Sequence, residues 1–351
     1  MRRTLSSPGF ALAAALAIRA AIPSPAAAQP PLELPQPSQA ASVSQRIGLT
    51  DIEVTYHRPA VNHREIWGHL VPYDQVWRAG ANENTVVRFS TSVSVAGKPL
   101  PAGAYGLHMI PTASTWTVIF NRESRAWGSF FYDSSEDALR VTVTPKASDF
   151  QEHLGYSFDD PSDHGVALIL RWEKLAVPIP IEVDTTATVA ESLHTQLRNL
   201  PGFSWQRLAE AAAWCAAHDT NLPEAAQWAD KALGIQKNFT TLRARAAVFE
   251  KQGDGAAAGK LRGQAFELAS EIDLNNLGYQ QLQAGRIDDA VATFRENITR
   301  HPESWNVYDS LGEALAMKGD KAGAAANYRK ALGMVTDEAQ KTRITGILGR
   351  M

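Results

Sequence analysis

The chain has 351 residues, of which 44% are hydrophobic and 20% are charged. These fractions are typical of a folded globular protein and exclude wholesale disorder. The formal net charge is −3, which excludes a strongly basic nucleic-acid binder. The single cysteine, Cys215, excludes an internal disulfide and any zinc or iron–sulfur site built from several cysteines. The length allows about two domains.

The first 28 residues have the features of a secretory signal peptide. Arg2 and Arg3 precede an apolar run over residues 10–18, and small residues at 26–28 offer a cleavage site. The run is shorter than the ~20 residues that a membrane span needs, and no later stretch is apolar enough to span a bilayer. We expect an exported protein, periplasmic or secreted after cleavage near Ala28, with no transmembrane segment. Residues 29–40 read as a proline-rich linker.

Residues 41–184 contain short alternating or β-branched runs without helical periodicity. Such runs occur at 52–56, 116–120 and 166–172, and turn residues such as Pro101-Ala102-Gly103 separate them. Many strands at this spacing predict an antiparallel β-sandwich or jelly-roll-like domain.

Residues 206–351 are rich in alanine and have helical periodicity, after a linker that we predict over 185–205. Four positions have a similar residue 34 positions later. Leu277 and Gly278 are matched by Leu311 and Gly312, and Ala290 and Phe294 are matched by Ala324 and Tyr328. This period is similar to that of the tetratricopeptide repeat, with about four units. Small residues at such positions let paired helices approach, and large ones pack between neighbours. We therefore expect an all-β domain followed by a tetratricopeptide-like α-solenoid, the alternative to the solenoid being an irregular alanine-rich bundle.

Two segments of the β half have a distinctive sequence. One is Trp77-Arg78-Ala79-Gly80-Ala81-Asn82-Glu83, and the other is Pro101-Ala102-Gly103-Ala104-Tyr105-Gly106-Leu107. With these segments, residues 34–184 resemble the bacterial family named domain of unknown function 2911, in a version followed by tetratricopeptide repeats. The resemblance implies an exported β-rich domain and no established reaction.

Three polar residues of the first segment are candidates for binding a small ligand. Arg78 carries a planar set of donors suited to a carboxylate or phosphate, and Asn82 and Glu83 add an amide and a carboxylate near the same turn. Glu83 is also a candidate acid–base group. The alternative is a buried Arg78–Glu83 ion pair that ties a loop to the domain.

Six of the nine histidines lie between positions 57 and 164. Two or three of them, brought together with Glu83 or Asp137, would be able to hold zinc, copper or iron, and His57 and His108 are the candidate ligands. Their spacing matches no established metal motif. The sequence therefore requires no cofactor.

The aromatic residues Trp67 and Trp127 are candidates for stacking on sugar rings, the alternative for both being burial in the core. Cys215 lies in an alanine-rich helical stretch and is expected to be a buried small hydrophobe. No Gly-x-Ser-x-Gly, Walker or dinucleotide-binding motif occurs.

Stacked helical hairpins form a concave face that can bind an extended peptide or a helix of another protein. The candidates for that face carry amide or guanidinium groups and lie on or near the first helices of the repeats: Arg243, Arg245, Asn275, Asn276 and Asn306. The alternative is that they are solvated helix positions on a stable platform.

The interpretation that we favour is an exported envelope binding or scaffold protein. Its repeats would bind a protein or peptide partner, and its β domain would bind a small ligand or pack on the solenoid. The alternative is a periplasmic enzyme, such as a metal-dependent hydrolase, with a site around Arg78, Glu83 and His108.

Overall fold

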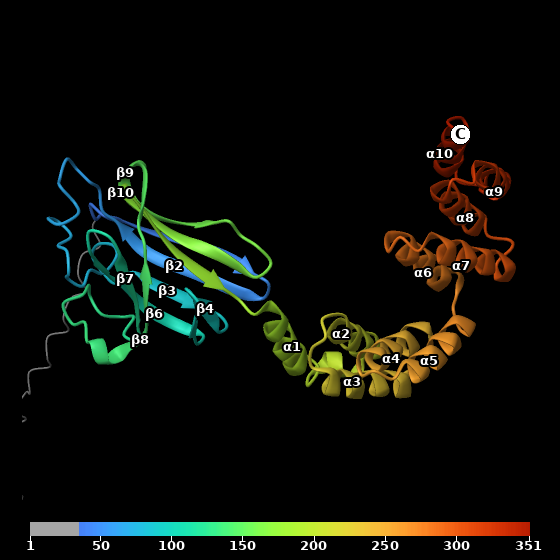
Figure 1. The fold of residues 1–351 in the computed structure, drawn as a ribbon, viewed down its shortest axis with the longest axis horizontal. Coiled ribbons are helices and arrows are strands. Elements are labelled where there is room, and N and C mark those ends of the chain that lie inside the picture. The colour runs from blue at the N-terminus through green and yellow to red at the C-terminus, as the bar shows by residue number, and fades with distance from the viewer. Residues whose placement is uncertain (1–34) are drawn as a thin grey trace, which may run out of the picture.

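The computed structural model describes residues 35–351. The expected signal peptide and the first part of the expected linker, residues 29–34, lie outside the described residues. An antiparallel β region over residues 39–182 is followed by ten consecutive α-helices over residues 185–348 (Figure 1). The expected order of an all-β part and then an all-α part is confirmed.

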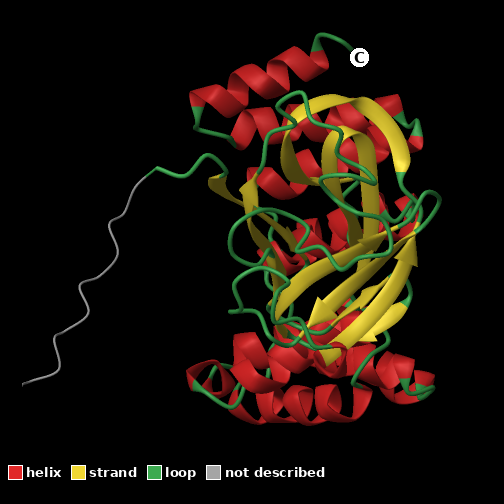
Figure 2. Cartoon of the chain, turned by 90° about the vertical axis from the view of Figure 1, so that its left-hand side faces the viewer, coloured by secondary structure: helices red, strands yellow, loops and turns green. Residues whose placement is uncertain are grey.

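The strands form two antiparallel sheets, with the strand orders β1-β2-β3-β6-β7-β8 and β5-β4-β10-β9. Figure 2 shows these strands in yellow and the helices in red. The strands are β1 (Gln39–Ile47), β2 (Thr50–Arg58), β3 (Val86–Phe89), β4 (Val93–Val95), β5 (Lys98–Leu100), β6 (Gly103–Pro111), β7 (Trp116–Asn121), β8 (Asp137–Val143), β9 (Lys146–Asp159) and β10 (Gly165–Glu182). A short 3-10 helix, η1 (Ser134–Glu136), precedes β8.

One apolar core lies between the sheets, because side chains alternate along each strand. In β2, Tyr56 belongs to this core, so the next residue, His57, faces the outer surface of the six-stranded sheet. In β6, Met109 belongs to the core, so His108 faces the same outer surface. The alternation thus places both candidate histidines on one face.

Four tryptophans pack together at one end of this core. The Trp67 ring lies 4.8 Å from the Trp116 ring and 5.7 Å from the Trp172 ring, and Trp77 stacks on Trp172 at 6.0 Å. Trp67 is only partly exposed, and its ring packs edge-on against its neighbours. The prediction of Trp67 as an exposed sugar-stacking residue was therefore wrong, because burial of its large apolar ring decides its place.

The helices of the second part are α1 (Thr185–Gln196), α2 (Trp205–Ala217), α3 (Leu222–Ile235), α4 (Phe239–Lys251), α5 (Gly255–Glu267), α6 (Glu271–Gln283), α7 (Ile287–Arg300), α8 (Trp305–Lys318), α9 (Lys321–Met334) and α10 (Glu338–Leu348). The segment that we predicted as a linker, 185–205, contains α1 and the 3-10 helix η2 (Leu200–Phe203). Among the described residues, no helix is both long and apolar enough to cross a membrane.

Helices α2 to α9 form four antiparallel hairpins, α2/α3, α4/α5, α6/α7 and α8/α9. Gly278 of α6 lies directly against the Phe294 ring of α7. Gly312 of α8 meets Tyr328 of α9 in the same way, since a Cβ there would lie 3.1 Å from the ring. The repeated small and large residues therefore pack against each other, as expected from the repeat.

The hairpins divide into two halves with separate apolar clusters. One cluster runs from Leu208 to Val248, and the other from Leu282 to Ile344. Helix α4 packs closely along α2, whereas α6 makes few contacts with α4. The solenoid is therefore interrupted between its second and third hairpins (Figure 1).

The β region and the repeats are joined through β10 and α1. At this junction the Thr185 hydroxyl donates to the Asp163 carbonyl at 2.7 Å, and Gly48 packs against the Thr185 side chain. Within residues 35–351, helices α2–α10 extend away from the sheets (Figure 1). The β domain therefore does not pack on the solenoid, contrary to one of our expectations.

Candidate functional site

The first helices of three successive hairpins line a groove of about 520 Å³. Its walls are one face each of α2, α4 and α6, at the point where the solenoid is interrupted. The lining residues are Trp205, Gln206, Ala209, Glu210 and Ala213 of α2, Phe239, Thr240, Arg243, Ala244 and Ala247 of α4, and Asp273, Asn276, Leu277 and Gln280 of α6. Two aromatic rings and several small side chains leave room for an extended chain.

The groove follows from the repeat. Each lining residue of α4 lies 34 residues after a lining residue of α2, so that Trp205 is matched by Phe239 and Ala209 by Arg243. Equivalent positions of stacked hairpins point to the same side of a solenoid. The same helical positions therefore line the groove in α2 and α4. At one of them, Arg243 of α4 stands where α2 has the small residue Ala209.

Arg243 is the half-buried cation of this groove. Its guanidinium lies 5.3 Å from the centre of the Phe239 ring, and it has no ion pair or side-chain hydrogen bond within residues 35–351. Burial lowers the pKa of Arg243, and the nearby cations Arg262 and Arg286 lower it further. An anionic group from a ligand would relieve both effects, because it would pair with a poorly solvated charge.

The carboxylates that line the groove have partners of their own. Glu210 accepts from Arg207 at 2.8 Å, and Asp273 accepts from the Ser270 hydroxyl at 2.7 Å in the N-cap of α6. Neither carboxylate pairs with Arg243. The groove therefore presents a free positive charge beside engaged negative ones.

The other predicted groove residues divide between this surface and the helix interfaces. Asn276 lines the groove together with Arg243. Asn275 accepts from Ser310 of α8 at 2.7 Å, so it joins two helices. Arg245 pairs with Asp230 of α3 at 2.7 Å and stacks on Phe249. Asn306 lies in the first turn of α8, outside the groove.

The β-domain candidates surround a loop whose two ends pair with β6. Trp77 and Met109 exchange backbone hydrogen bonds of 2.8 Å, and the Leu107 amide donates to the Thr85 carbonyl at 2.8 Å. Residues 78–84 form a loop outside the sheet, and the chain pairs with β6 both before and after this loop. The residue of β6 between these two pairings is His108.

Arg78 follows Trp77 and Asn84 precedes Thr85, so these two residues are the first and last of the loop. Both therefore lie next to His108. A Cβ on Gly106 would lie 3.1 Å from Asn84 Nδ2 and 3.2 Å from His108 Nε2, so these two side chains meet above a glycine. His108 is 2% exposed, and its Nδ1 lies 2.9 Å from the Ser129 hydroxyl. Burial lowers the pKa of His108 to about 4, although the negative charge of Asp137 acts to raise it.

Arg78 lies beneath the connection between β7 and β8. A Cβ on Gly128 would lie 3.3 Å from its Cδ, and its buried Nε has no hydrogen-bond partner. Burial lowers the pKa of Arg78. The predicted alternative of an Arg78–Glu83 pair was wrong, because Glu83 Oε2 lies 3.3 Å from His57 Nε2 instead. Arg78 lies against Gly128, whereas Glu83 lies against His57.

The Asn82 side chain is hydrogen-bonded to the segment that precedes β1. Its amide donates to Gln36 Oε1 at 2.5 Å and to the Ser38 carbonyl at 3.2 Å. It therefore fixes the segment that leads into β1. Trp127 is 53% exposed and stacks on Phe130 at 5.8 Å, so it remains accessible at the surface.

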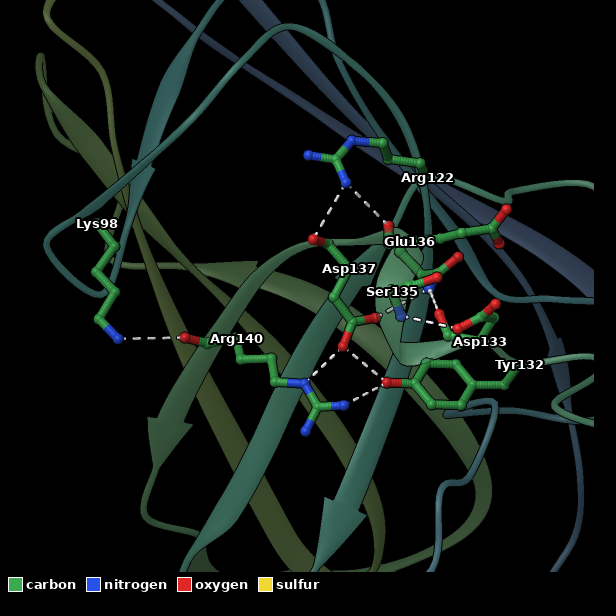
Figure 3. Close-up of polar contacts among 9 residues, drawn as sticks. Lys98, Arg122, Tyr132, Asp133, Ser135, Glu136, Asp137 and Arg140 are labelled. Atoms are coloured by element: carbon green, nitrogen blue, oxygen red, sulfur yellow. Dashed lines mark hydrogen bonds and ion pairs between the residues drawn. The ribbon is translucent and has the colours of Figure 1, made fainter.

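Figure 3 shows a polar cluster at the start of β8 that the sequence did not reveal. Asp137 Oδ2 accepts from Tyr132 at 2.7 Å and from Arg140 Nε at 2.5 Å, while Oδ1 accepts from Asn121 at 2.9 Å. Burial and the hydrogen bond to Asp137 raise the pKa of Tyr132 to about 12. The cluster anchors the connection that covers Arg78 and His108.

The predicted metal ligands are not brought together. His57 pairs with Glu83, whereas His108 bonds to Ser129. In the described part of the chain, no group of three or more His, Cys, Asp or Glu side chains is placed to hold a metal ion. Arg78, Glu83 and His108 thus border one loop without forming one open site.

Comparison with known proteins gives one family match, which lies over the β region. Residues 38–181 match a family model described as "Protein of unknown function (DUF2911)". The resemblance seen in the sequence is therefore confirmed for the β region. No curated protein matches the chain.

The solved structures that match lie over the helical part and are tetratricopeptide-repeat proteins. MamA is 17% identical, with a TM-score of 0.28, over 45% of this chain and 92% of that chain. YrrB, "a TPR protein with an unusual peptide-binding site", is 17% identical, with a TM-score of 0.28, over 46% and 91%. PilF of Pseudomonas aeruginosa is 20% identical, with a TM-score of 0.26, over 39% and 63%. Their likeness concerns the fold alone.

Proposed function

We propose that this protein is a scaffold that binds a partner protein in the groove between α2, α4 and α6. The occupant is an extended segment that places an acidic side chain or a terminal carboxylate against Arg243. The observation that carries the proposal is the half-buried guanidinium of Arg243, which has no partner in the described chain and lies in a groove with aromatic and small side chains.

The shape of the groove supports an extended ligand. Trp205 and Phe239 offer flat apolar surfaces one repeat apart, and Leu277 continues the apolar wall on α6. Thr240, Asn276 and Gln280 provide polar side chains along the same path, able to bond to the backbone of a bound segment. A ligand that spans α4 and α6 would also bridge the two halves of the solenoid.

The test is a selection of short fluorescent peptides of randomised sequence on the intact chain. We expect the selected peptides to share a carboxylate flanked by apolar residues. The Arg243→Gln variant should bind them about tenfold more weakly or worse, since it loses a charge-assisted hydrogen bond in a partly buried site. The matched control is Arg329→Gln, which removes an exposed arginine of α9 outside the groove.

Binding by the Arg329→Gln variant should equal that of the native protein. Selected peptides that bind equally well to Arg243→Gln, or a selection that recovers no peptide, would contradict the proposal.

A further inference from the structure

The outer face of the six-stranded sheet carries a second hollow, of about 700 Å³. It is unrelated to the helical groove of the proposed function. Its floor comes from β1 and β2, and one wall comes from the return of the loop after Trp77. The lining residues are Ala40, Ala41, Ser42, Thr55, Tyr56, His57, Glu83, Asn84, Val86, Ser124, Arg125 and Ala126.

Glu83 supplies the negative charge of this hollow. Its side chain is 50% exposed, and one carboxylate oxygen lies 3.3 Å from Nε2 of His57, whose side chain is 17% exposed. No other ion pair or side-chain hydrogen bond engages Glu83 within residues 35–351. The carboxylate is thus held in position by a single neighbour and keeps acceptor capacity for a ligand.

Two buried acceptor atoms next to Glu83 lack partners. The Asn84 side chain is 6% exposed and donates through Nδ2 to the Glu123 carbonyl at 3.3 Å, which leaves its buried Oδ1 unpaired. Nδ1 of His57 is also buried and unpaired, and it is an acceptor in the tautomer whose Nε2–H faces Glu83. An unpaired buried acceptor is costly, so this set favours a ligand that brings donors.

The register of the sheet explains why these groups meet. Thr55 of β2 pairs with Val86 of β3, and continuing that antiparallel register by two residues places Asn84 opposite His57. Glu83 precedes Asn84 at the end of the loop, where it can reach back over the same face. Residues far apart in the sequence thus place one exposed carboxylate and two buried, unpaired acceptor atoms beside one hollow.

We propose that this hollow binds a small molecule through a primary ammonium group. The ammonium ion is placed against the Glu83 carboxylate, and its remaining N–H groups face Asn84 and His57, whose unpaired acceptor atoms lie beneath the surface of the hollow. Arg125 lies at the rim and is exposed, so the far end of the ligand is neutral or anionic rather than cationic. A zwitterion of the amino-acid type fits both requirements.

A sugar fits the hollow less well. Stacking on an aromatic face is a main source of affinity for sugar rings, and the one tyrosine of the lining, Tyr56, is 6% exposed. No tryptophan or phenylalanine lines this hollow. The charge of Glu83 selects instead for a cationic donor.

The test compares γ-aminobutyrate with γ-hydroxybutyrate on the intact chain by isothermal titration calorimetry. The two probes differ only in an ammonium group and a hydroxyl. We expect the amino compound to bind at millimolar concentration and the hydroxy compound to bind about tenfold more weakly or worse. Glu83→Gln, which keeps the shape of the side chain, should weaken the amino compound by a similar factor.

The matched control is Glu53→Gln, which removes the same charge from the outer face of β2 outside the hollow. It should leave binding unchanged. No binding of the amino compound to the native chain, equal binding of the two probes, or undiminished binding to Glu83→Gln would each overturn the proposal. Circular dichroism of both variants confirms that the comparison is made on folded protein. Because peptide binding is assayed at the helical groove, either proposal can fail without the other.

Discussion

Ala209 and Arg243 occupy the same position, 34 residues apart, on the groove faces of α2 and α4. Because the alanine is small, the surface beside the arginine stays open. The repeat therefore creates a concave surface, and Arg243 at the position equivalent to Ala209 gives that surface a positive charge. The small residues thus give the groove its shape, and Arg243 gives it its positive charge.

The contact between Gly278 and Phe294 predicts that even a methyl side chain at position 278 lowers the free energy of unfolding. A Cβ on Gly278 would overlap the Phe294 ring, so Gly278→Ala should destabilise the helical part by about 1–3 kcal/mol. A Cβ on Gly259 of α5 would meet no atom within 4 Å, so Gly259→Ala should instead stabilise by about 0.5–1 kcal/mol. Urea unfolding followed by circular dichroism measures both. Equal effects of the two variants would contradict the packing described.

The buried His108 predicts a pH dependence of stability. Its pKa is about 4 in the folded chain and 6.5 in the unfolded chain, so the unfolded chain binds a proton first as the pH falls. The free energy of unfolding should therefore decrease between pH 6.5 and pH 4, by at most about 3 kcal/mol from this group. Urea unfolding of the native protein and His108→Gln across this range isolates the effect. A parallel pH dependence of the two proteins would be evidence against the burial of a neutral imidazole.

The polar cluster of Figure 3 predicts a measurable change at Tyr132. Asp137→Asn removes the charge that accepts from both Tyr132 and Arg140. The pKa of Tyr132 should then fall below about 12, and the free energy of unfolding should fall by about 2 kcal/mol. Ultraviolet titration of the phenolate, with Tyr132→Phe to identify the signal, measures the first effect. An unchanged Tyr132 titration would show that Asp137 has no part in it.

The junction between the two halves of the solenoid depends on Arg300. Its Nη1 donates to the Phe266 carbonyl at 2.8 Å, and its guanidinium lies 5.0 Å from the centre of the Phe266 ring. Arg300→Ala should speed amide exchange at the end of α5 and the start of α6, with little change in α2 and α3. Hydrogen-exchange mass spectrometry measures this. Faster exchange throughout the repeats would indicate general destabilisation instead.

The helical fold could be predicted from the sequence because its period is local. Leu277 and Gly278 recur at 311 and 312, and each glycine packs against an aromatic ring of its own hairpin. The groove was harder to predict, because its sharpest sequence signal is the match of Trp205 with Phe239, which differ in residue type. The interruption after α5 also shortens the step between first helices, since α4 begins at 239 and α6 at 271.

The β-domain site could be predicted only in part, because strand register is not a local property. The turn from Arg78 to Glu83 was recognisable, but the partner of Glu83 depends on which residue of β2 lies beside it. The sequence left a choice between an Arg78–Glu83 pair and an open site. Long-range pairing with His57 decides that choice, and no spacing within the loop encodes it.

The most direct test of the groove proposal is a charge-reversal cycle with a peptide selected on the native protein. Arg243→Glu should abolish binding of the acidic peptide, and replacing the carboxylate of the peptide by lysine should abolish its binding to the native chain. Combining the two changes should restore a large part of the affinity, because the pair is formed again with its charges exchanged. If the combined changes leave binding as weak as either change alone, Arg243 does not contact the carboxylate, and the account of the groove is wrong.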